Sequence, residues 1–74
     1  MQKYNDKNKD SNIDEFDCGK DYIKVKFFDG VIYTYTYSSA GAFHIETMKK
    51  LANAHNGLNS YINKNKPNYK SKIK

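Results

Sequence analysis

Two runs of strand-like residues joined by an Asp-Gly dipeptide constrain the fold of this chain more than any other feature. Residues 22–28, YIKVKFF, alternate apolar and polar side chains, and residues 31–37, VIYTYTY, are rich in β-branched and aromatic side chains. Both patterns are typical of strands, and Asp-Gly between two strands is a strong hairpin signal. The sequence therefore predicts an antiparallel hairpin over residues 22–37.

The length of the hairpin loop decides which face of the sheet the tyrosines occupy, because strand side chains alternate between faces. A two-residue Asp-Gly loop puts Lys26 opposite Tyr33 and interleaves tyrosines with lysines on one face, as on a platform for single-stranded nucleic acid. A three-residue loop, residues 28–30 with a left-handed glycine, puts Val25 opposite Tyr33 and turns Tyr33 and Tyr35 toward the core. The second register separates apolar from polar side chains more cleanly, so it is favoured.

The remaining pattern predicts an α+β fold on a small three-stranded antiparallel sheet. Residues 12–18, NIDEFDC, carry apolar side chains at imperfectly alternating positions and predict a short edge strand ahead of the hairpin. Two helices follow, which gives the element order β-β-β-α-α. We expect the first and longer helix to pack on one face of the sheet.

Apolar spacing changes to a helical period in the second half of the chain. Residues 43–55 place their apolar side chains on one helical face. Ser38 or Ser39 can cap the start of this helix, and Gly57 can end it from the left-handed C′ position. Residues 58–64, LNSYINK, predict a short second helix.

The chain divides into a polar start, one domain and a basic end. Residues 1–11 are polar and without periodicity, which is typical of disorder. Residues 12–69 form a single domain, and residues 70–74 form a basic tail. A chain of 74 residues buries only about 60–65% of its unfolded surface. Because Cys18 has no second cysteine for a disulfide, we expect self-association into a homo-oligomer to supplement its stability.

Cysteine content and hydropathy indicate a cytoplasmic protein without a membrane partner. A lone cysteine fits a reducing compartment. No apolar run approaches the roughly 18 residues that span a bilayer, and the first residues lack the hydrophobic stretch of a signal peptide.

The charge of the chain is uneven and suggests a polyanionic partner. Residues 18–74 hold ten lysines against three acidic residues. Such a basic domain is typical of proteins that bind nucleic acid, nucleotides or an acidic protein surface. The chain has no arginine, and bidentate recognition of guanine depends on arginine. The sequence therefore argues against sequence-specific recognition of duplex DNA.

Catalytic and metal-binding patterns are missing from the sequence. It contains no GxSxG, P-loop or GxGxxG motif. His44 and His55 would lie about 16 Å apart on one helix, which is too far for a shared metal ion. Cys18 stands beside Asp17 and Asp21, which disfavour its thiolate. We expect a protein that is not an enzyme and that uses no cofactor and no metal.

The spacing of the strand and helix residues resembles that of the KTSC domain, a small module found at the C-terminus of some lysyl-tRNA synthetases and also as a free-standing protein. The resemblance covers about residues 22–69. The matching positions are Ile23, Val25, Phe27, Gly30, Tyr33, Tyr35, Leu58, Asn59 and Ile62. The association of this family with a tRNA synthetase implies contact with RNA.

Together these observations predict a non-catalytic binding module for RNA, other single-stranded nucleic acid or nucleotides, through a surface of lysine and aromatic side chains. The candidate ligand-binding residues are Lys24, Lys26, Phe28, Tyr37, Lys64, Lys66, Tyr69 and Lys70. The alternative is a phage- or mobile-element-type protein-interaction factor, an inhibitor or sequestering protein that forms homo-oligomers. Phe28 and Ile32 would form an apolar patch for it beside the hairpin tip.

Overall fold

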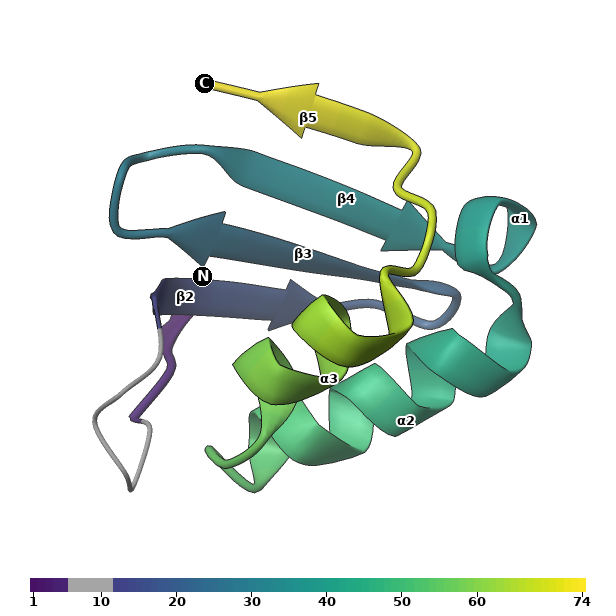
Figure 1. The fold of residues 1–74 in the computed structure, drawn as a ribbon, viewed down its shortest axis with the longest axis horizontal. Helices are drawn as coiled ribbons and strands as arrows, with labels where there is room; N and C mark the ends of the chain where they lie inside the picture. The colour runs from purple at the N-terminus through teal and green to yellow at the C-terminus, as the bar shows by residue number, and fades with distance from the viewer. Residues whose placement is uncertain (6–11) are drawn as a thin grey trace.

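The part of the chain that the structure describes forms a five-stranded antiparallel sheet and three helices (Figure 1). The computed structural model describes residues 1–5 and 12–74. Its elements are β1 (Gln2–Lys3), β2 (Ile13–Cys18), β3 (Tyr22–Phe27), β4 (Ile32–Thr36), α1 (Tyr37–Ala40), α2 (Ala42–Asn53), α3 (Leu58–Asn65) and β5 (Ser71–Ile73). The strands lie in the order β1-β2-β3-β4-β5. The predicted α+β class is confirmed, but the prediction of three strands is wrong.

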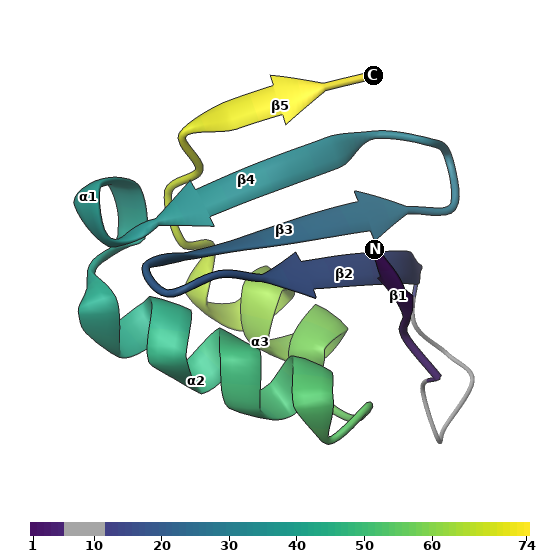
Figure 2. The same ribbon diagram turned by 180° about the vertical axis from the view of Figure 1, so that it is seen from behind.

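One of the two additional strands comes from the start of the chain. β1 pairs with β2, with Gln2 opposite Phe16, and lies at the edge of the sheet remote from β5 (Figure 2). Tyr4 follows β1 and is only 4% exposed, and its hydroxyl oxygen accepts a hydrogen bond of 3.1 Å from the backbone N–H of Leu58. The expectation of disorder over residues 1–11 therefore fails for residues 2–4. Burial of the Tyr4 side chain holds this segment in place despite its polar composition. Residues 6–11 lie outside the described part.

The other additional strand comes from the end of the chain. β5 pairs with β4, with Ile32 opposite Ile73 and Tyr33 opposite Lys72. Within the predicted basic tail, residues 70–74, the segment Ser71–Ile73 thus forms an edge strand. Three residues are too short for alternation alone to reveal a strand, and the exposed edge of β4 supplied the pairing partner.

The hairpin adopts the favoured three-residue loop. Val25 lies opposite Tyr33, and Ile23 lies opposite Tyr35. The N–H of Phe27 donates to the carbonyl of Val31 at 3.0 Å, and Gly30 has a left-handed φ of +90°. The prediction that Tyr33 and Tyr35 belong to the inner face of the sheet is thus confirmed.

Replacing Gly30 by alanine should lower the free energy of unfolding by about 1 kcal/mol, because an L side chain is strained in the left-handed region. A Cβ atom built there meets nothing within 4 Å, so the backbone alone carries the cost. Gly30→Asn should lower the free energy of unfolding by less, since asparagine tolerates this conformation. Urea unfolding followed by circular dichroism measures both. An alanine variant as stable as the wild type would mean that the loop has another conformation.

The helices begin and end differently from the sequence expectation. Ser39 belongs to a separate short helix, α1, where its N–H donates at 3.0 Å to Oγ1 of the N-cap residue Thr36. The main helix α2 is instead preceded by Gly41. At its end His55, with a φ of +54°, takes the left-handed position expected for Gly57, which is the N-cap of α3. The second helix lies at the predicted place.

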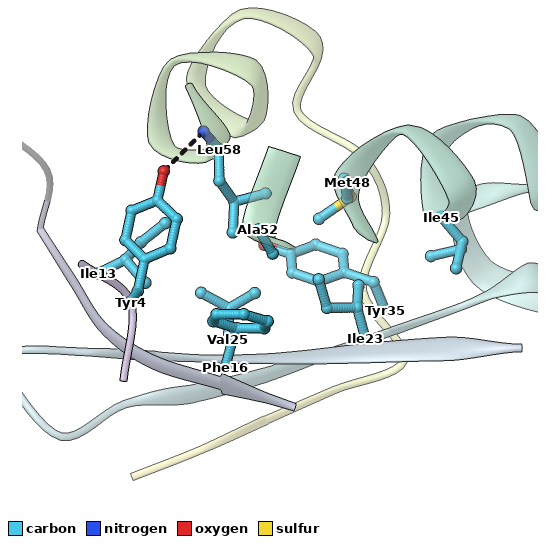
Figure 3. Close-up of a cluster of buried hydrophobic side chains, with 10 residues drawn as sticks. All are labelled: Tyr4, Ile13, Phe16, Ile23, Val25, Tyr35, Ile45, Met48, Ala52 and Leu58. Carbon is cyan, nitrogen blue, oxygen red and sulfur yellow. Dashed lines mark hydrogen bonds between the residues drawn. The ribbon is translucent and has the colours of Figure 1, made fainter. Parts of the chain in front are cut away.

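The core lies between the sheet and the helices α2 and α3 (Figure 3). α2 contacts β3 and β4 and buries Ile45, Met48 and Ala52. The buried cluster consists of Tyr4, Ile13, Phe16, Ile23, Val25, Tyr35, Ile45, Met48, Ala52 and Leu58. Ile23 and Val25 of β3 belong to this cluster and Phe27 packs against it, as the alternation predicts.

Candidate nucleic-acid interface

An open groove of about 670 Å³ lies where the inner face of the sheet extends beyond the buried cluster. One wall is the segment that joins α3 to β5, residues 66–70, which we call the strap. The hairpin tip closes one end. The lining residues are Asn12, Phe27, Phe28, Asp29, Tyr33, Tyr35, Ile62, Asn63, Lys66, Pro67, Asn68 and Tyr69. Aromatic and amide side chains thus dominate the groove.

The aromatic rings of the groove hold one another in place. The rings of Tyr33 and Tyr35 are nearly parallel, 13° apart with centroids at 6.2 Å. Tyr69 stands edge-on to Tyr33 at 5.0 Å, and Phe27 contacts Tyr33 in the same way at 5.4 Å. Tyr69 is nevertheless 48% exposed and Phe28 is 66% exposed. The groove therefore combines a rigid aromatic lining with ring surface that a ligand can reach.

Lysines flank this aromatic surface. Lys66 ends α3 and lines the groove. Lys72 extends from β5, with its Nζ 5.6 Å from the ring centroid of Tyr33. Asp29 is the carboxylate among the described lining residues, and its Oδ1 accepts the N–H of Val31 at 3.0 Å. Positive charge thus predominates around the groove.

The lysines of β3 lie on the opposite face of the sheet, and carboxylates stand beside them. Asp17 is the cross-strand partner of Lys24, and Glu15 is the partner of Lys26. Cross-strand partners share a face and lie within side-chain reach. Because each lysine has an acidic neighbour, this pair contributes less to the binding of a polyanion than the sequence alone suggested.

A second hollow, of about 640 Å³, lies on that outer face beside the strap. Lys24, Tyr37 and Lys70 all line it. The hydroxyl of Tyr37 donates to a carboxylate oxygen of Glu46 at 2.5 Å, and this hydrogen bond raises the pKa of Tyr37. Other lining residues are Asp21, Tyr22, Thr34, Thr36, Ser38 and Ser39. Hydroxyl groups and two ammonium groups give this hollow its chemical character.

The side chains that the sequence offered for catalysis or metal binding, those of His44, His55 and Cys18, lie among contacts that support the fold. Nδ1 of His44 lies 2.6 Å from the hydroxyl of Tyr61, and Nδ1 of His55 accepts the N–H of Asn5 at 3.0 Å. Burial raises the pKa of the Cys18 thiol, which disfavours a reactive thiolate. Among residues 1–5 and 12–74, no three or more His, Cys, Asp or Glu side chains gather closely enough to hold a metal ion.

The structure places the predicted site residues in two separate sites and leaves two of them outside both. Phe28, Lys66 and Tyr69 meet at the groove, while Lys24, Tyr37 and Lys70 meet at the outer hollow. Lys26 and Lys64 line neither of them.

Sequence reasoning missed one cation and part of the lining. Lys72 is not among the candidate residues named above, because residues 70–74, KSKIK, are too short for alternation alone to indicate a strand. Asn12, Asn63 and Asn68 also line the groove, and no local pattern brings these three together.

In the described part of the chain, no helix combines the length and the apolar character that crossing a membrane requires. The resemblance to the KTSC domain stays a prediction. No protein-family model, no curated protein and no solved structure matches this chain.

Proposed function

We propose that this protein is a non-catalytic, KTSC-like binding module whose groove takes single-stranded nucleic acid or nucleotides. The observation that carries the proposal is the groove itself, where the exposed rings of Phe28 and Tyr69 lie beside Lys66 and Lys72. Stacking of a base on an aromatic side chain contributes about 1–3 kcal/mol. Lysines attract the phosphates, and the implied contact of KTSC domains with RNA points in the same direction.

The chemistry of the groove favours single strands and tolerates different sequences. Its rings can stack only on bases that are not already stacked and paired within a duplex. Because the chain has no arginine, it lacks the planar fork that reads guanine. The amides of Asn63 and Asn68 can donate and accept hydrogen bonds with any base.

Fluorescence anisotropy with labelled single-stranded RNA and DNA tests this proposal. Both should bind at low salt, and the affinity should fall as salt rises, because lysine–phosphate contacts release counterions. Tyr69→Ala should weaken binding about tenfold through the loss of one stacking partner. Phe43→Ala is the matched control, since Phe43 is 77% exposed and does not line the groove.

Two outcomes would contradict the proposal. One is that no single strand and no nucleotide binds at low salt. The other is that Tyr69→Ala and Phe43→Ala bind as tightly as the wild type while their circular dichroism shows an unchanged fold.

A specific observation also favours the alternative, a phage- or mobile-element-type interaction factor that forms homo-oligomers. Ile32 and Ile73 lie opposite one another on the outer face, and Ile73 is 61% exposed on the edge strand β5. Such a patch suits contact with a protein. Light scattering distinguishes the two functions. A concentration-dependent dimer that Ile73→Asp abolishes would support the alternative, and a strict monomer would count against it.

A further inference from the structure

Lysines lie on both sides of the edge strand β5. Lys66 and Lys72 are at the aromatic groove on the inner face, whereas Lys70 is at the hydroxyl-lined hollow on the outer face. We propose that the ligand is a polymeric single strand rather than a mononucleotide, and that it crosses the β5 edge. This proposal rests on the proposed function. Its bases lie in the groove, and its phosphodiester backbone continues into the hollow.

The distribution of charge supports a polymer. A mononucleotide concentrates about two negative charges on one phosphate and requires cations that converge on it. Here Lys66 lines the groove together with Asp29, and Lys24 and Lys70 line the hollow together with Asp21. An acidic side chain offsets part of the positive charge at each site, so neither site offers the converging cations that one phosphate dianion requires. A phosphodiester strand carries one charge per nucleotide, which matches cations spread along a path.

The hollow has the chemistry of a backbone site rather than a base site. Phosphate oxygens accept hydrogen bonds, and sugar–phosphate backbones are contacted mainly by hydroxyl, ammonium and backbone N–H groups. Thr34, Thr36 and Ser38 supply hydroxyl groups beside Lys70. The groove, in contrast, supplies the rings of Tyr33 and Tyr69.

The strap joins the two sites and is held in position. Tyr69 and Lys70 are neighbours in the sequence, yet they line opposite faces of the sheet, because the chain bends at Lys70 before β5 begins. The hydroxyl of Ser39 donates to the carbonyl of Asn68 at 2.8 Å. The N–H of Lys70 donates to the carbonyl of Thr34 at 2.6 Å. These hydrogen bonds therefore fix the position of the strap between the two sites before a ligand arrives.

Lysines on an edge strand have another known use, because they discourage pairing between sheets of separate molecules. That role predicts self-association of lysine variants and no effect on ligand binding. The length of the ligand also separates the two roles, since edge protection places no requirement on it.

The test is a length series of oligouridylates, from uridine monophosphate to an octamer, in competition against a labelled octamer. Affinity should rise with length over about four to six nucleotides, and uridine monophosphate should bind at least about a hundredfold more weakly than the octamer. Lys70→Gln should weaken the octamer about threefold, lower its salt slope by about 0.7 and leave a dinucleotide unchanged. Lys50→Gln, an exposed α2 residue that lines neither site, is the matched control.

The outcomes separate this inference from the proposed function. If uridine monophosphate binds as tightly as the octamer, or if Lys70→Gln has no more effect than Lys50→Gln, the polymer path is wrong while nucleotide binding in the groove stands. If Lys70→Gln only promotes self-association, edge protection replaces the path. If no ligand of any length binds, both proposals fail.

Discussion

Replacing Tyr4 by alanine should lower the free energy of unfolding by about 3 kcal/mol, the lower end of the range for a truncated buried aromatic residue. The ring is buried against Phe16, with centroids 6.0 Å apart and an edge-on arrangement. The hydroxyl oxygen accepts the N–H of Leu58 at the start of α3, a donor that the helix itself leaves without a partner. One side chain thus joins the first strand to the last helix (Figure 3).

Tyr4→Phe separates the two contributions. It keeps the ring and removes the hydroxyl, so it should cost about 1 kcal/mol and lower the Tm by about 4–8 °C. Urea and thermal unfolding followed by circular dichroism measure both variants. Gln2→Ala, at an exposed residue of the neighbouring strand β1, is the control and should be nearly neutral. Equal stability of Tyr4→Ala and wild type would mean that the first strand does not contribute to the fold.

Alkaline pH should destabilise the wild type more than Tyr35→Phe. Burial, followed by the nearby hydroxyls of Tyr33 and Tyr69, raises the pKa of Tyr35 from 10.0 to about 12. The folded protein therefore holds this proton more tightly than the unfolded chain does. This stabilisation is complete below pH 10 and is lost as the pH rises from about 10 through 12. After allowance for solvent at the open groove, its size is about 1–2 kcal/mol.

Denaturant unfolding of wild type and Tyr35→Phe between pH 8 and 12 checks this expectation. Lysine side chains also lose protons in this range, but they do so in both proteins, so the difference between the two curves isolates Tyr35. The difference in unfolding free energy between the wild type and Tyr35→Phe should change by about 1–2 kcal/mol between pH 8 and 12. Parallel curves would show that the Tyr35 hydroxyl is as well solvated in the folded protein as in the unfolded chain.

Local patterns predicted the hairpin well because its determinants are close in sequence. Alternation placed Ile23 and Val25 in the core, and Gly30 adopts the left-handed conformation that the three-residue loop requires. The same reasoning failed at the end of α2, where His55 takes the left-handed C′ position, while Gly57, which is also left-handed, is the N-cap of α3. There the ring of His55 packs against Tyr4 and Phe16, which are distant in the sequence. The left-handed backbone conformation of His55 is one that its local propensity disfavours, so local sequence alone did not predict it.

The candidate site was predicted only in part, for a related reason. Basic and aromatic composition singled out Phe28, Lys66 and Tyr69, which do meet at one groove. Composition cannot show that Asp17 lies beside Lys24, since these residues meet through pairing of β2 with β3. It also cannot show that Lys70 and Lys72 reach different faces of the sheet.

The sequence by itself determined the hairpin, the glycine of its loop, the α+β class and the absence of arginine. These properties depend on neighbouring residues or on composition. Only the tertiary structure decided that both ends of the chain extend the sheet, that Tyr4 enters the core and that lysines surround the β5 edge. The physical reason is that alternation is a local property, whereas strand pairing depends on which distant segment reaches an exposed edge.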